Sequence, residues 1–267
     1  MSIIIERIGK VAWITICRPE AMNAMDIETM QAFRAAFIGF RDDSSVHVAV
    51  LRGAGEAAFC AGADLKNTMP PPNNFASGYF EPVEKSIHEG MYTRALSLGS
   101  LQLHKPVIAA VNGHALGGGL EIALACDLRI GSTNASFGLP EARWATVPAF
   151  GGISRLLRAV PNAVAMKMLL TGTPIDAAEA FRVGLISDLV APTDLDEAAL
   201  ELANRVAGNG PLAVRSIKET VRRVQDLPLS EAVALEQLMW GVLRDTEDRI
   251  EGRRAFAEKR DAKYTGN

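Results

Sequence analysis

Residues 113–127 read GHALGGGLEIALACD, in which three consecutive glycines, Gly117–Gly119, precede a single acid, Glu121. The apolar run after the glycines is typical of a helix, yet glycine costs roughly 1 kcal/mol relative to alanine inside a helix. Glycines at a helix start let a ligand approach the backbone, whose free N–H groups bind a phosphate or the oxyanion of an activated carbonyl. Close helix packing, with Glu121 capping its own helix, is an equally good interpretation of these residues alone.

Two further stretches place an acid or a free N–H at a turn or at an expected helix start. Residues 59–66 read FCAGADLK, so that a turn of small residues exposes the Ala63 N–H and puts Asp64 in the position of a helix N-cap. Residues 136–156 read SFGLPEARWATVPAFGGISRL, with Glu141 directly after Pro140 at a typical helix start. An ordinary turn and a helix-start acid facing the helix dipole are the alternative interpretations.

Several other chemistries have no support in the sequence. The phosphate-binding pattern GxxxxGK[ST], the dinucleotide pattern GxGxxG and the nucleophile elbow GxSxG are absent, the last also around Ser154. The histidines show no metal-ligand spacing, and no CxxC pair is present, which favours reduced thiols and no metal site at Cys17, Cys60 and Cys126. A formal net charge of −3 argues against a nucleic-acid partner.

The N-terminal stretch MSIIIERIGKVAWITICRPE carries Glu6, Arg7 and Lys10 among its apolar residues, which is unlike a signal peptide. No run reaches the roughly 18 apolar residues of a membrane span. We therefore expect a cytoplasmic protein with no membrane partner.

An α/β arrangement must position the three stretches, because strands and helices alternate along the first part of the chain. The residues predict two strands joined at Gly9, a helix that begins at Asp26 and extends to Arg41, and buried strands within 46–53 and 104–113. Residues 67–78 have the composition of a loop.

The later part of the chain is richer in helix patterns. Residues 81–103 are mostly helical, and the predicted helical segments after residue 150 are 151–182, 193–207, 211–225 and 228–262. The sequence therefore predicts an α/β core over residues 1–190 and a helical region over residues 191–267.

Taken in this order, the stretches resemble the crotonase superfamily, specifically the enoyl-CoA hydratase/isomerase family. The resemblance covers essentially the whole chain. It is carried by CRPEAMNAMD, AFCAGADLK, KPVIAAVNGHALGGGLEIALACDLRI, ASFGLPEARWATVPAFGG, TGTPIDAAEAFRVGLISDLV and AFAEKR. The resemblance implies a spiral of ββα units in the core and C-terminal helices used for trimerisation. The expected assembly is a homotrimer or a dimer of trimers.

The resemblance also implies a site for the thioester of an acyl-CoA. It makes the N–H groups of Ala63 and Gly118 an oxyanion hole, which stabilises the enolate that forms when C2 gains or loses a proton. Glu121 and Glu141 match the two catalytic carboxylate positions, and we assign Glu121 to the water and Glu141 to the proton at C2. Along the CoA moiety the resemblance places Met22, Ala61, Asp64, Leu65 and Lys66, joined by Phe256 and Lys259 of a neighbouring subunit.

The implied activity is reversible hydration of a 2-enoyl-CoA to a 3-hydroxyacyl-CoA, with no metal and no redox cofactor. Double-bond isomerisation, a specialised dehydration and thioester hydrolysis would use the same oxyanion hole, and an acyl-CoA-binding protein without catalysis is a further alternative. The two glutamates favour hydration. Arg143, Trp144, Ala149 and Phe150 depart from the pattern of hydratases, and bulk at these positions would narrow the acyl pocket or displace the water. The Pro-rich loop 67–80 lies where the acyl pocket of the family varies, which leaves the length and polarity of the acyl chain open.

Overall fold

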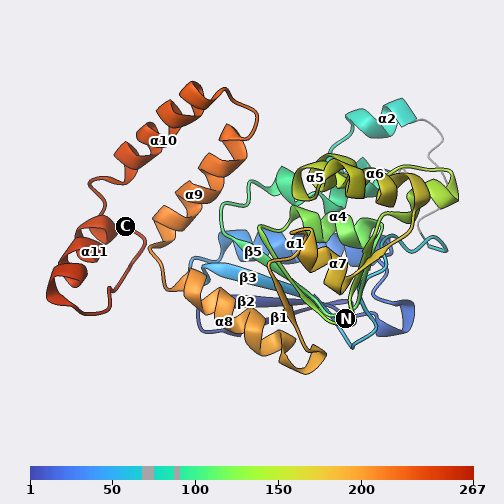
Figure 1. Ribbon diagram of the computed structural model, residues 1–267, viewed down its shortest axis with the longest axis horizontal. Coiled ribbons are helices and arrows are strands. Elements are labelled where there is room, and N and C mark those ends of the chain that lie inside the picture. Colours follow the sequence, from blue (N-terminus) through green and yellow to red (C-terminus); the bar gives the residue numbers. More distant parts are fainter. Residues whose placement is uncertain (68–74, 87–90) are drawn as a thin grey trace.

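The computed structural model describes residues 1–67, 75–86 and 91–267, which form two β-sheets flanked by helices (Figure 1). The larger sheet has six strands in the order β1-β2-β3-β5-β7-β10. The pair β1–β2 is antiparallel, whereas the other neighbouring strands run parallel. The strands are β1 Ile3–Ile8, β2 Val11–Ile16, β3 Val48–Gly53, β5 Val107–Val111, β7 Leu128–Ser132 and β10 Asp188–Val190.

The expected strand pair at the N-terminus is confirmed as a hairpin of β1 and β2. Its turn includes Gly9, whose φ of 60° lies in the left-handed region that two-residue hairpin turns require. The buried strands expected within 46–53 and 104–113 are likewise confirmed as β3 and β5.

Both faces of the larger sheet are covered by helices, as parallel sheets require. Helix α1 (Ile27–Asp42) packs Phe33, Phe37 and Phe40 on one face, and the Asp26 side chain accepts a hydrogen bond from Thr29 N–H at its N-cap, as expected. A fully buried aromatic side chain stabilises the fold by about 1.5–3 kcal/mol.

Helix α8 (Leu195–Ala207) covers the opposite face, where its alanines meet Val48, Val50 and Ile108. Small alanine side chains allow this helix to lie close to the strands. The sequence places α8 in the C-terminal region, and the division of the chain at residue 190 stays a prediction.

The smaller sheet explains how the three candidate stretches come together. Its strands, in the order β4-β6-β8-β9, are β4 Ala58–Cys60, β6 His114–Leu116, β8 Ser136–Gly138 and β9 Ile175–Asp176. The first three are parallel, and each follows a long strand of the larger sheet along the chain. This repetition confirms the mixed α/β spiral. Because the carboxyl ends of parallel strands meet at one edge, the segments after β4, β6 and β8 lie side by side.

One loop prediction needs correction. Helix α2, Phe75–Phe80, begins inside the stretch 67–78 expected to be a loop, while residues 68–74 lie outside the described residues. The expected helical stretch 81–103 is built of short pieces, since proline and glycine interrupt it. These pieces are α3 Val83–Ser86 and the 3₁₀ turns Tyr92–Leu96 and Leu98–Leu101, and residues 87–90 are outside the described residues.

The helical character after residue 150 is confirmed. Helices α9 to α11 extend away from the sheets as an arm, at the left of Figure 1. The arm exposes large apolar side chains, among them Leu229, Leu238 and Trp240. The helices of this part are α5 Gly152–Ala159, α6 Asn162–Thr171, α7 Ala177–Arg182, α9 Pro211–Val224, α10 Leu229–Leu243 and α11 Glu247–Glu258.

The three cysteines are unpaired thiols, as expected. Burial raises the pKa of Cys60 and of Cys126 to about 12, so that both stay protonated. No helix within the described residues is long and apolar enough to cross a membrane.

The packing of helix α4 (Gly118–Ala125) against β4 gives a stability test. A Cβ added to Gly119 would lie 1.9 Å from the carbonyl oxygen of Cys60, so that the helix and the strand must separate in Gly119→Ala. We expect Gly119→Ala to lower the free energy of unfolding by about 3 kcal/mol or more.

Gly39→Ala is the matched control, because Gly39 is exposed in α1 and an added Cβ would meet no atom within 4 Å. The free energy of unfolding of Gly39→Ala should rise by up to about 1 kcal/mol, because alanine has a higher helix propensity than glycine. Urea unfolding followed by circular dichroism measures both variants, and equal midpoints would contradict the close approach at Gly119.

Candidate active site

Each glycine of the Gly117–Gly119 run has its own structural reason. Gly117 has φ 54° and ψ −126°, a backbone conformation that L side chains rarely adopt. Gly118 is the first residue of α4, and Gly119 lies against the carbonyl of Cys60. The glycines therefore let the start of α4 touch neighbouring backbone with no side chain between them.

The N–H groups of Gly118 and Ala63 are close to each other. A Cβ placed on Gly62 would lie 3.0 Å from the Gly118 nitrogen, so the turn after β4 runs directly past the start of α4. On both sides of Ala63, hydrogen bonds with Met25 fix this turn: Met25 N–H donates to Gly62 O at 2.8 Å and Asp64 N–H donates to Met25 O at 3.0 Å. Among the described residues, neither Ala63 N–H nor Gly118 N–H donates to a protein acceptor.

Glu121 lies on the first turn of α4 with only 2% of its surface exposed. It does not cap its own helix. Its Oε1 accepts hydrogen bonds from Phe150 N–H at 3.0 Å and from Gly152 N–H at 2.8 Å. Burial raises the pKa of Glu121, while these N–H groups and the Arg155 guanidinium oppose the rise. The carboxylate therefore has fixed hydrogen-bond partners for its ionised form.

Glu141 is the second residue of the 3₁₀ turn Pro140–Trp144, which follows β8, so the expected helix start after Pro140 is confirmed. Its Oε1 lies 3.3 Å from the position of a Cβ on Gly117, which brings this acid next to the glycine run. Its Oε2 is buried and has no hydrogen-bond partner in the described part of the chain. Burial first, and the charge of Glu121 second, raise the pKa of Glu141 to about 7.

The two acids thus face the same short stretch of backbone in different environments. Glu121 accepts hydrogen bonds from main-chain N–H groups, whereas Glu141 leaves an oxygen without a partner. Environments that give two neighbouring acids different pKa values are typical of an acid–base pair. The arrangement can hold a polarised carbonyl at the N–H groups while one carboxyl accepts a proton and the other donates one.

The segment before α5 completes the site, and the sequence did not reveal that its main-chain N–H groups bind Glu121. A Cβ on Gly152 would lie 2.9 Å from both Cγ and Oε1 of Glu121. The ring of Phe150 lies 3.5 Å from the position of a Cβ on Gly118. The adjacent glycines Gly151 and Gly152 before a helix were the available signal, since they indicate N–H groups free to bind.

The residues expected along the CoA moiety fall into two groups. Met22, in the left-handed region at φ 55°, accepts a hydrogen bond from Ala61 N–H, and Leu65 and Lys66 are exposed beside them. Asp64 is not a helix N-cap within the described residues. Its carboxylate accepts a hydrogen bond from Lys66 N–H, and it forms an ion pair with Arg18 at 3.2 Å.

Phe256 and Lys259 are the second group. Phe256 is 88% exposed on α11, and Lys259 directly follows that helix. In Figure 1, α11 lies at the far end of the molecule from α4, so these two residues are not brought to the site of their own chain.

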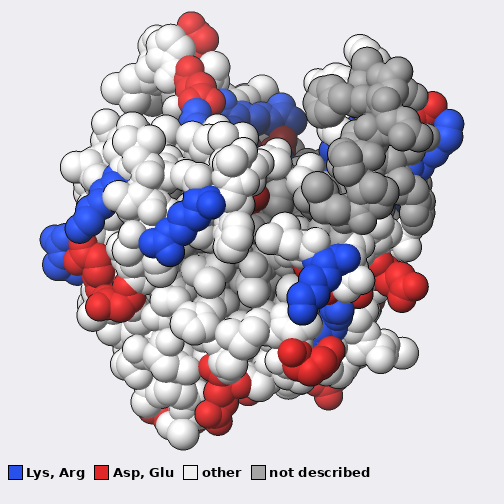
Figure 2. Space-filling view, turned by 90° about the vertical axis from the view of Figure 1, so that its right-hand side faces the viewer, with Lys and Arg blue, Asp and Glu red and all other residues white. Residues whose placement is uncertain are grey.

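Figure 2 shows the face on the side of α2, where acidic atoms are visible inside a hollow near the centre and basic side chains lie on both sides of it. No group of three or more His, Cys, Asp or Glu side chains in the described segments is arranged to hold a metal ion.

Comparison with known proteins places this geometry in a family. The sequence profile of the enoyl-CoA hydratase/isomerase family matches residues 6–267. The chain is 45% identical to (E)-benzylidenesuccinyl-CoA hydratase of Thauera aromatica, with 100% of each chain covered. It is 40% identical to short-chain-enoyl-CoA hydratase of Clostridium acetobutylicum, with 97% of this chain and 95% of the relative covered.

Solved structures agree with the sequence relatives. An enoyl-CoA hydratase from Bacillus anthracis superposes with a TM-score of 0.89 at 35% identity, over 100% of both chains. The spiral of two sheets, the glycine-lined start of α4 and the full-length similarity lead to one conclusion: the chain belongs to the enoyl-CoA hydratase/isomerase family of the crotonase superfamily.

Proposed function

We propose that this protein catalyses the reversible addition of water to a 2-enoyl-CoA, giving a 3-hydroxyacyl-CoA. The observation that carries the proposal is the convergence of two unlike carboxyl groups on two free N–H groups. Glu141 lies against Gly117, Glu121 lies one turn behind Gly118, and the Gly118 nitrogen lies beside the turn that carries Ala63.

In this proposal the thioester oxygen accepts hydrogen bonds from Ala63 N–H and Gly118 N–H. Main-chain donors of this kind stabilise negative charge that develops on the oxygen, and losing one donor in other enzymes costs about 3 kcal/mol. Their position leaves room for the acyl chain, because glycine and alanine present little side chain. The polarised carbonyl makes C3 of the conjugated double bond electrophilic.

The two acids then divide the proton transfers. Ionised Glu121 accepts a proton from water as the water oxygen bonds to C3, and the electron pair of the double bond moves toward the thioester oxygen. Neutral Glu141 donates its proton to C2 as the enolate collapses. Water thus supplies the hydroxyl at C3, and a proton returns from Glu121 to Glu141 through solvent, so that the balance is one water added. The pKa of Glu141 near 7 keeps an appreciable fraction protonated at neutral pH.

The proposed substrate class is supported by the substrates for which two relatives are named and by the side chain of Phe150. One relative is named for a benzylidenesuccinyl-CoA and another for short-chain enoyl-CoA esters. Phe150 places an aromatic ring against Gly118, where the reacting end of the acyl chain would lie. We favour an acyl group whose ring or branch packs on Phe150 over a plain short chain.

The remaining expectations belong to the same proposal. CoA would lie along the segments of Met22 and Ala61–Lys66, while Phe256 and Lys259 would contact CoA bound to a neighbouring subunit. The exposed apolar side chains of the α9–α11 arm support assembly into a trimer or a dimer of trimers. The proposed steps need only main-chain N–H groups and carboxyl groups, with no metal or redox cofactor, in a cytoplasmic enzyme.

An activity measurement tests the proposal. Loss of the conjugated enoyl-thioester absorbance is followed with crotonyl-CoA and with benzylidenesuccinyl-CoA, and the products are identified by mass. We expect a gain of one water, with faster turnover of the ester that bears the ring. Glu141→Gln and Glu121→Gln should each lower kcat by about 10²–10⁴-fold, because each removes one proton transfer.

Glu201→Gln is the matched control, since Glu201 is an exposed acid on α8, and its kcat should equal that of the unmodified protein. Release of free CoA would indicate thioester hydrolysis, and an isomer of unchanged mass would indicate double-bond migration. Either product, or binding without any turnover, would contradict hydration.

The raised pKa of Glu141 gives a test that does not depend on activity. Because the pKa in the folded protein, about 7, exceeds the ordinary value of 4.5, folding favours the protonated acid. This contribution to stability is complete below pH 4.5 and is lost as the pH rises through 7. Glu141→Gln has no charge to lose and should be more stable than the unmodified protein at pH 8, by about 1 kcal/mol after allowance for solvent screening.

Urea unfolding at pH 5 and pH 8 measures this difference, with Glu201→Gln as the control for loss of an exposed acid. The advantage of Glu141→Gln should shrink at pH 5. An advantage of the same size at both pH values would show that Glu141 is not held as a neutral acid.

A further inference from the structure

Three successive peptide groups connect Glu121 to Arg155, a half-buried arginine. The peptide that ends at Phe150 and the peptide that ends at Gly152 each donate an N–H to Glu121 Oε1, at 3.0 and 2.8 Å. The peptide between these two carries the carbonyl oxygen of Phe150. This oxygen accepts a hydrogen bond from Arg155 Nη1 at 2.8 Å. The Arg155 guanidinium therefore binds the middle peptide of the segment 149–152, and the two outer peptides of this segment bind the Glu121 carboxylate.

The backbone of this segment is shaped around the arginine. Gly151 has φ 111°, and a Cβ added to it would lie 2.1 Å from Arg155 Nη1. Arg155 N–H also donates to Gly151 O at 2.9 Å, which ties the arginine to the same turn through the first turn of α5. A side chain at Gly151 would therefore displace the guanidinium from the carbonyl that it binds.

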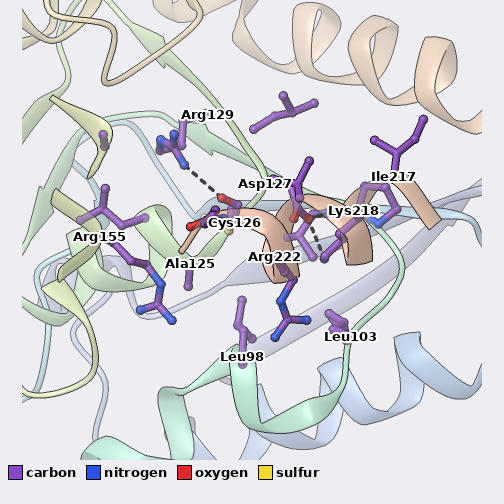
Figure 3. A pocket seen from close by; sticks show the side chains of 18 of the residues that line it. Leu98, Leu103, Ala125, Cys126, Asp127, Arg129, Arg155, Ile217, Lys218 and Arg222 are labelled. Atoms are coloured by element: carbon purple, nitrogen blue, oxygen red, sulfur yellow. Dashed lines mark hydrogen bonds and ion pairs between the residues drawn. The ribbon is translucent and has the colours of Figure 1, made fainter. Parts of the chain in front are cut away.

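Arg155 also lies at the wall of a separate cavity of about 880 Å³ between α9 and the sheets (Figure 3). Its guanidinium and that of Arg222, on α9, extend to the same side in Figure 3, toward Leu98. Burial first, and the charge of Arg222, lower the pKa of Arg155, whereas the charge of Glu121 opposes this shift. Of the protein groups in the described segments, Phe150 O is the hydrogen-bond acceptor of this guanidinium.

We propose that Arg155 is a positioning residue for Glu121: it holds the Phe150 carbonyl, and thereby aims two N–H groups at the carboxylate that activates water. This inference rests on the proposed role of Glu121. Arg155 touches neither substrate nor water in this account, and acts through the main chain and through its positive charge.

The variants Arg155→Met and Arg155→Lys separate the two effects. Arg155→Met removes the charge and the donors but keeps the aliphatic stem, whereas Arg155→Lys keeps the charge without the planar fork. Arg158→Met is the matched control on the same helix, because Arg158 also lines the cavity but binds Ser154 O and Asp226 at the surface.

We expect Arg155→Met to lower kcat at least tenfold with KM for the acyl-CoA changed less than twofold. The acidic limb of its kcat profile should move to higher pH, because a cation that favours ionised Glu121 is gone while Glu141 still faces the carboxylate. Arg155→Lys should return the acidic limb of the kcat profile to its original pH, but it should not restore the full kcat.

Arg158→Met should match the unmodified enzyme in kcat and in the position of the acidic limb. A kcat loss in Arg155→Met with an unmoved pH profile would mean a structural role only and would overturn the proposal.

A second measurement keeps the inference separate from the proposed activity. Side-chain carboxyl carbons of glutamate are labelled with ¹³C, and the Glu121 resonance is identified by its absence in Glu121→Gln. In an NMR titration, Glu121 should titrate at higher pH in Arg155→Met than in the unmodified protein and in Arg158→Met. If the Glu121 titration in Arg155→Met is unchanged, the positioning role is overturned, whether or not the protein hydrates an enoyl-CoA. If the Glu121 titration shifts but the unmodified protein shows no turnover, the proposed function alone fails.

Discussion

The start of α4 rests directly on the backbone of β4 and of the turn that follows it, with no side chain between them. The contact is made by Gly119 against Cys60 O and by Gly62 beside the Gly118 nitrogen. This main-chain packing brings two free N–H groups together from segments more than 50 residues apart in the sequence. It also fixes the distance of both carboxyl groups from that point, because Glu121 is on α4 and Glu141 follows the adjacent strand β8.

The different environments of the two acids follow from the segments that surround them. The turn before α5 supplies Glu121 with N–H donors and, through Arg155, with a nearby positive charge. Glu141 lies on a 3₁₀ turn and has no such donors for Oε2. Glu121 thereby has partners for its ionised form, while Glu141, with a pKa of about 7, keeps an appreciable protonated fraction near neutral pH. The proposed hydration requires this difference, because one acid must accept a proton and the other must donate one.

The sequence predicted the hairpin, α1 with its Asp26 cap, the central strands and the later helices, because apolar periodicity and capping residues act locally. It did not predict the helix at Phe75–Phe80, where prolines and asparagines dominate the preceding residues. It also predicted an N-cap role for Asp64, which was wrong, because Asp64 instead pairs with Arg18. The residues alone left the glycine run open between packing and binding. The structure shows that Gly119 packs against Cys60 O, whereas Gly118 N–H has no acceptor among the described residues, and ligand binding at that N–H stays a prediction. The Arg155–Phe150–Glu121 connection depends on side-chain contacts between α4 and α5, which no pattern in one segment reveals.

The central claim is that Ala63 N–H and Gly118 N–H polarise a thioester carbonyl. Infrared difference spectroscopy of a 2-enoyl-CoA labelled with ¹³C at the thioester carbon tests it most directly, in a Glu141→Gln complex that binds without turnover. Two hydrogen bonds to the oxygen weaken the C=O bond, so the labelled band should move to lower wavenumber on binding. A band at the same wavenumber as in free solution would contradict the account.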